Sequence, residues 1–258
     1  MRKKVNTLTV VFLLLVSIIL LQGVNGPAQA EDTSSEGAWE FALAPFYLWA
    51  VSLDGEVVVG PQGSSVSMDF GDIFDNLEAV FIVHFETIYK KKYGLLFDTN
   101  FINLGDTATT PATDINIDLE ATVAELLPYY RWSNGDHRLD FMAGILYSRV
   151  AQDVSFSAAL PKIDVTEDWV DPLIALRWSW DFADRWGLIV KGGVGGFGVS
   201  SDSVWEGSGL LTYQPWKHAQ FILGYRAVGI DYETGVEPTR FVYDITMAGP
   251  VFGLNFKW

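Results

Sequence analysis

The sequence predicts an all-β protein, an antiparallel up-and-down transmembrane β-barrel of ten strands. First, apolar and polar residues alternate with a period of two through most of the chain, which is the pattern of half-buried strands. Second, the chain is 49% hydrophobic and 14% aromatic although its net charge is −15. Third, no apolar run after residue 30 is long enough for a membrane helix, and a membrane chain without helices must close its sheet into a barrel.

The N-terminus has the layout of a secretory signal peptide. A basic stretch at residues 2–4 precedes an apolar run over 10–21 and a small-residue cleavage site that ends at Ala30. The apolar run is shorter than the ~20 residues that a membrane anchor needs. Cleavage there would leave residues 31–37 as a short periplasmic segment and 38–258 as the barrel. The exported chain has no cysteine, so we expect no disulfide.

The alternating stretches predict the ten strands in order: 39–53, 78–90, 93–104, 115–132, 138–156, 165–180, 186–200, 204–213, 219–232 and 241–258. Every second connection is short, and one of these holds Asn134-Gly135, a favoured hairpin pair. Outer-membrane barrels have short periplasmic turns and longer outer loops, so we expect both chain ends in the periplasm and an even strand count. Eight or twelve strands stay open as alternatives.

The longest connection, over 54–77, follows the first predicted strand. Two short alternating stretches joined by Pro61-Gln62-Gly63 predict an extracellular hairpin, with a short helical turn after it. Loops of this length are often functional.

Aromatic residues mark the ends of the predicted strands. Tryptophans cluster beside the short turns, where they would form the interfacial girdle of a barrel: Trp132, Trp180, Trp186, Trp216 and Trp258. The alternative is core packing in an exported soluble β-sandwich that binds a ligand.

The closing residues resemble an assembly signal. Gly253, Phe256 and Trp258 are spaced as in the C-terminal signal read by the barrel-assembly machinery of Gram-negative bacteria, although Val251 replaces the usual polar residue. The chain after residue 30 resembles a widespread, largely uncharacterised family of Gram-negative outer-membrane β-barrel proteins, in the class of small OmpA-like or OmpW-like barrels. The stretches that carry this resemblance are 39–41, 45–49, 193–201 and 223–226. The resemblance implies an outer-membrane location and a barrel, and it implies no catalytic residues.

Charged residues recur on the polar face of the predicted strands, where they would point into the lumen. Opposite charges on neighbouring strands can pair there, because an unpaired buried charge is costly. We expect this lattice to fill most of a narrow lumen. Its predicted members are His84, Glu86, Asp98, Glu125, Arg131, Asp171, Arg177, Lys191, Arg226 and Lys257.

Two motifs in the sequence resemble functional sites. Residues 193–198 match the glycine spacing of a dinucleotide-binding turn, but the predicted strand continues through them and no helix follows. His84 and Glu86 lie on one face of a predicted strand and could serve an outer-membrane enzyme that acts on lipid or peptide, yet no serine or second histidine clearly joins them. We therefore expect no enzymatic activity, no cofactor and no metal.

The sequence favours a structural barrel or a narrow channel that prefers cations, since acidic residues crowd the predicted outer loops. The expected partners are outer-membrane lipid, lipopolysaccharide and the barrel-assembly machinery. Nucleic acid is not expected, because a chain this acidic lacks a basic footprint.

Overall fold

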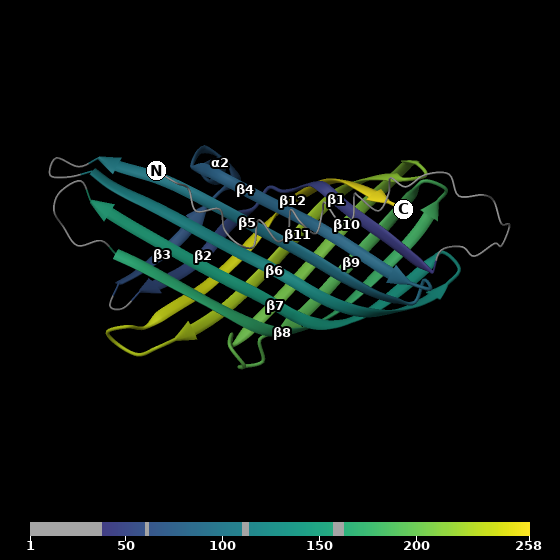
Figure 1. Ribbon diagram of the computed structural model, residues 1–258. Coiled ribbons are helices and arrows are strands. Elements are labelled where there is room, and N and C mark those ends of the chain that lie inside the picture. The colour runs from purple at the N-terminus through teal and green to yellow at the C-terminus, as the bar shows by residue number, and fades with distance from the viewer. Residues whose placement is uncertain (1–37, 60–61, 110–113, 157–162) are drawn as a thin grey trace, which may run out of the picture. The chain divides into compact units, whose positions relative to one another are not determined.

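The computed structural model describes residues 38–59, 62–109, 114–156 and 163–258 (Figure 1). The predicted signal peptide and the segment 31–37 lie outside the described residues. Within the described ranges no helix is both long and apolar enough to cross a membrane.

Strand pairing closes the sheet into a barrel of ten strands. Each strand of the ring pairs antiparallel with its neighbours, and β1 pairs with β12 to complete the ring. This confirms the predicted ten-stranded barrel and shows that the β-sandwich alternative is wrong. The ring consists of β1 (Trp39–Trp49), β4 (Leu77–Tyr89), β5 (Tyr93–Thr109), β6 (Asp114–Asn134), β7 (His137–Phe156), β8 (Ile163–Ala183), β9 (Trp186–Gly195), β10 (Ser203–Trp216), β11 (Ala219–Thr234) and β12 (Phe241–Lys257).

The long connection after β1 contains two further strands and a helix. β2 (Ser52–Val59) pairs with the N-terminal half of β12, whereas β1 pairs with its C-terminal half. β1 and β2 therefore lie one after the other along the same edge of β12. β3 (Gln62–Met68) pairs with β2. The helix α2 (Phe70–Asp75) follows, and the Asp69 side chain caps it by accepting a hydrogen bond from the Asp72 amide at 2.9 Å.

β4 meets β1 only between residues 84 and 89. Among the described residues, no strand pairing joins β3 to the outer half of β4. The helix α2 follows β3 in this region, and its Ile73 side chain is buried.

β9 is shorter than the sequence predicts. It ends at Gly195 instead of residue 200, because Gly196, Phe197 and Gly198 have positive φ angles of 79°, 54° and 69° and turn the chain. The glycine run therefore divides between a strand and a turn, where the sequence interpretation placed all of it in a strand. The next element is β10, so the helix that a dinucleotide-binding motif needs is absent at this position.

Candidate functional site

The outward face of the barrel changes polarity part-way along the strands. On β8, outward side chains from Trp180 to Val170 are apolar and exposed or half-buried, whereas Asp168 and Asp164 are exposed further along the same face. On β11 the same face changes from Leu223 and Tyr225 to charged residues at its far end. The apolar part adjoins the short turns and is about ten residues long, the length of a strand that crosses a membrane at a tilt.

The five tryptophans expected near the short turns are all exposed at that end of the barrel. This is where an interfacial girdle of a membrane barrel lies.

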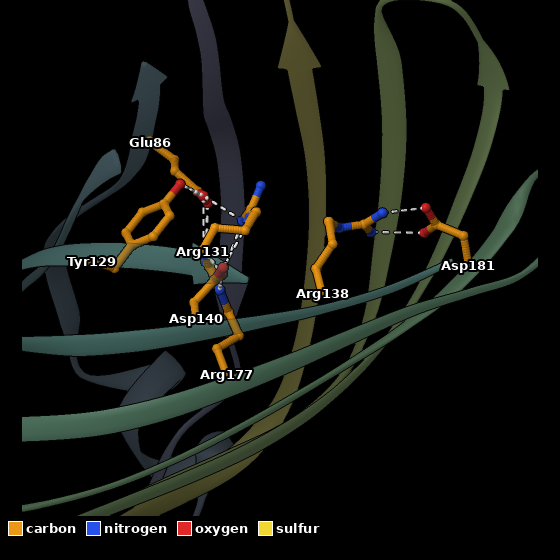
Figure 2. Close-up of polar contacts among 7 residues, drawn as sticks. All are labelled: Glu86, Tyr129, Arg131, Arg138, Asp140, Arg177 and Asp181. Carbon is orange, nitrogen blue, oxygen red and sulfur yellow. Dashed lines mark hydrogen bonds and ion pairs between the residues drawn. The ribbon is translucent and has the colours of Figure 1, made fainter. Parts of the chain in front are cut away.

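The inward face of this half holds charged side chains that contact one another across the lumen. One group centres on Arg177 of β8 (Figure 2). Its guanidinium donates to both carboxylate oxygens of Glu86 of β4, at 3.0 and 2.7 Å, and its Nε donates to Asp140 at 2.8 Å. β4 and β8 are not neighbours in the ring, so the bonds between Arg177 and Glu86 cross the lumen, whereas Asp140 lies opposite Arg177 on the neighbouring strand β7.

Arg131 and Tyr129 complete this group. The Arg131 guanidinium binds both oxygens of Asp140, at 2.6 and 2.9 Å, and the Tyr129 hydroxyl donates to Glu86 at 2.5 Å. Asp140 is fully buried. The bidentate Arg131 guanidinium and the Arg177 guanidinium together supply the compensation that burial of the Asp140 charge requires.

A second group centres on Arg226 of β11. Arg226 donates to Asp98 at 2.8 Å and also to Glu125. The Lys191 ammonium donates to Glu125 at 2.6 Å and to Glu206 at 2.9 Å. Glu125 is 1% exposed, and it is held between two cations.

Together the two groups form what we call the plug. It contains four cationic side chains and five carboxylates, with His84 beside them: Arg131, Arg177, Lys191, Arg226, Glu86, Asp98, Asp140, Glu125, Glu206 and His84. Eight of these ten side chains are members of the lattice expected from sequence.

The structure places the remaining expected residues elsewhere. Asp171 accepts hydrogen bonds from the Ser201 amide at 2.7 Å and the Ser201 hydroxyl at 2.6 Å, which ties the β9–β10 turn to β8. Lys257 lines the lumen near the short turns, and its carbonyl contacts the His218 ring at 2.9 Å. Sequence reasoning missed Asp140, Glu206 and Tyr129, although alternation along their strands would have placed all three on the inward face.

The histidine and glutamate proposed for catalysis have separate partners. His84 Nδ1 lies 3.0 Å from Asp98, and its ring stacks on Tyr47 with 5.5 Å between centroids. Glu86 is bound by Arg177 and Tyr129 instead. In the described part of the chain, no group of three His, Asp or Glu side chains is placed to hold a metal ion.

A cavity lies on each side of the plug. The cavity toward the short turns has a volume of about 940 Å³ and is lined by many charged and polar residues, including Arg131, Arg138 and Lys257. The cavity toward the long loops has a volume of about 530 Å³ and an almost wholly apolar lining. Trp49 and Asn100 form its floor, because Trp49 stacks over the Arg226 guanidinium at 4.9 Å and Asn100 donates to Asp98 at 2.9 Å.

No family model and no curated protein matches the chain. Among solved structures, the translocator domain of the autotransporter NalP from Neisseria meningitidis has a TM-score of 0.40 at 10% identity, covering 86% of this chain and 90% of that chain. A FadL homologue from Pseudomonas aeruginosa has a TM-score of 0.35 at 9% identity, covering 86% and 90%. The outer membrane protein OprG from Pseudomonas aeruginosa has a TM-score of 0.31 at 9% identity, covering 88% and 99%.

Proposed function

We propose that this chain is an integral outer-membrane protein whose barrel is sealed by the plug and does not conduct ions. The apolar outward band supports a membrane location. The closed ring agrees with it, because a sheet in lipid satisfies all of its backbone hydrogen bonds only when it is closed. Short turns face the periplasm in such barrels, so the acidic long-loop end faces outward.

The cross-lumen contacts of Arg177 are the observation that carries the proposal. A conducting pore needs a continuous path of water along its axis. Here a guanidinium from β8 binds a carboxylate from β4 on the far side of the ring and a second carboxylate from β7. Arg226 likewise joins β11 to Asp98 of β5 and Glu125 of β6. The geometry therefore favours a structural barrel over the narrow cation channel that the sequence also allows.

The proposal assigns the chain no catalytic role. It keeps the partners expected from sequence: outer-membrane lipid and lipopolysaccharide around the barrel, and the barrel-assembly machinery during biogenesis. Phe256 and Trp258 are exposed near the short turns, where a C-terminal assembly signal would be accessible.

Planar-bilayer recordings test the seal. We expect the wild-type protein to give no conductance steps above those of the bare bilayer. The double variant Glu86→Ala/Arg177→Ala removes one negative and one positive charge from the plug and leaves the Arg131–Asp140 pair intact, so we expect it to fold and to show steps.

The matched control is Arg138→Ala/Asp181→Ala. This pair has the same chemistry, with contacts of 2.5 and 2.9 Å, but lies apart from the plug (Figure 2). We expect this control variant to give no conductance steps. Steps from the wild-type protein would show that the lumen is open, and a silent Glu86→Ala/Arg177→Ala variant would show that this part of the plug does not seal it.

A further inference from the structure

Beyond the plug, the polarity of the inward and outward faces of the barrel is reversed relative to the membrane half. In the membrane half the outward side chains are mostly apolar and the inward ones include the charged residues of the plug. In the outer half, inward residues of β12 are Met247, Ile245 and Tyr243, while outward Asp244 is exposed. Leu53 and Val57 of β2 line the cavity, and outward Asp54 and Glu56 are exposed.

The same exchange occurs on other strands. On β6, Leu119, Ala121 and Val123 line the cavity, whereas Asp118 and Glu120 are exposed on the other face. An acidic outer surface is suited to water and not to a lipid interior. The outer half therefore stands outside the membrane as a water-exposed barrel with an apolar interior.

We propose that this outer half is a cup that binds a small, neutral, apolar molecule outside the membrane. The proposal goes beyond the sealed barrel, because a sealed barrel needs no ligand. The residues that define the cup are those lining the cavity between its floor at Trp49 and Asn100 and the outer strand ends at Val59, Val165 and Phe241.

The volume fits such a ligand. Small-molecule sites are apolar cavities of roughly 300–1,000 Å³ with a few placed polar groups. The cup measures about 530 Å³. The floor of the cup is held in place by the plug. Trp49 contacts Arg226 and Asn100 contacts Asp98, and these two charged residues bind one another.

The residues that line the cup disfavour a charged ligand. The residues that line the cup include no lysine, arginine, aspartate or glutamate within the described ranges. An anionic amphiphile would find no cation there and would first meet the acidic outer surface. A cation would lose its water and find no carboxylate within the cup.

Two polar atoms at the floor have no partner. Trp49 Nε1 and Asn100 Oδ1 are buried and make no hydrogen bond within the described residues. A buried donor and a buried acceptor without partners are unfavourable, and a ligand hydroxyl could accept from the indole or donate to the amide oxygen. The floor therefore favours an apolar molecule that carries a hydroxyl group.

Equilibrium dialysis with the full barrel in lipid nanodiscs tests the cup, using 1-naphthol as the neutral probe and 1-naphthoate as its anionic counterpart. Empty nanodiscs measure partition into lipid. We expect saturable 1-naphthol binding at about one per barrel, and no saturable 1-naphthoate binding. A wild-type barrel that takes up no more 1-naphthol than empty nanodiscs, or that binds both probes equally, overturns the proposal and leaves the sealed barrel untouched.

Variants locate the site. Ala121→Trp fills the cup, so we expect at least a tenfold loss of 1-naphthol affinity. Thr122→Trp places the same side chain on the outward face of the same strand and should bind as the wild type does. If Ala121→Trp fails to fold, Gln152→Lys supplies the missing cation within the lining and should bind 1-naphthoate. Unchanged 1-naphthol binding in a folded Ala121→Trp barrel, or no gain of 1-naphthoate binding in Gln152→Lys, counts against the cup.

Discussion

Tyr129 lies across the backbone of Gly94, and this contact positions one side of the plug. The two residues face each other in the β5–β6 register. A Cβ atom on residue 94 would lie 2.0 Å from the Tyr129 ring. The glycine thus leaves room for the ring, whose hydroxyl then reaches Glu86 at 2.5 Å.

Gly94→Ala should therefore destabilise the barrel by about 1–3 kcal/mol, the usual cost of overpacking. Urea unfolding in micelles, followed by tryptophan fluorescence, measures it. Gly207→Ala is the control, since its added methyl group would meet nothing within 4 Å. Equal stability of the Gly94→Ala variant and the wild type would mean that Tyr129 moves away at no cost.

The sequence predicted that most residues of the plug face inward, but not which of them contact one another. Alternation identifies His84, Asp98 and Arg226 as inward residues of their own strands. It cannot tell that Arg226 meets Asp98 across 128 positions of sequence, because that contact depends on how the ring closes. Asp171 shows the opposite error, since its inward position brings it to Ser201 instead of a cation.

Antiparallel pairing brings two acidic residues face to face at the outer ends of β11 and β12. Asp231 is directly opposite Asp244, beyond the apolar band. Partial burial, with the nearby charges of Asp244 and Asp202, raises the pKa of Asp231 above its ordinary value. A carboxyl whose pKa is higher in the folded state binds more protons there, so stability falls as the pH rises through that range.

Asp231→Asn should relieve this repulsion. We expect a gain of about 0.2–1 kcal/mol at neutral pH, the scale of cross-strand pairs. The gain should vanish near pH 3, where the wild-type carboxyl is largely protonated in both states. Thermal unfolding at the two pH values measures it. Asp54→Asn serves as the control, because Asp54 faces Thr246 and Ser67 instead of an acid. A gain that persists at acid pH would assign the effect to something other than charge.

Strand ends depended on backbone geometry more than on side-chain pattern. Alternation runs through residues 186–200, yet the chain leaves the sheet at Gly195, where glycines permit positive φ angles. The first strand divides at Ala50, where partnering of β12 passes from β1 to β2. Neither event changes the apolar and polar order of the residues.

At the scale of the whole molecule, the reversal of polarity sets the depth of the barrel in the membrane. Ile174 belongs to the apolar band of β8, Asp168 lies beyond it, and Asp184 lies in a short turn. The chain contains no cysteine, so single cysteines can be introduced without a background.

In intact Gram-negative cells, a membrane-impermeant maleimide should label Asp168→Cys and leave Ile174→Cys unlabelled. Asp184→Cys should react only after the outer membrane is permeabilised. Mass shifts on gels provide the measurement. Labelling of Asp184→Cys alone in intact cells would reverse the orientation, and fast labelling of Ile174→Cys would place the apolar band outside lipid.

The sequence by itself determined the class of fold, an even number of strands, the short turns and the face of most side chains, because these follow from the period of the chain and from local turn residues. Only the tertiary structure decided which charges meet, that they form a plug, and that an apolar cup lies beyond it. The stagger of tilted strands controls which inward residues share a level of the lumen. That stagger is a property of the closed ring, and no single stretch of sequence carries it.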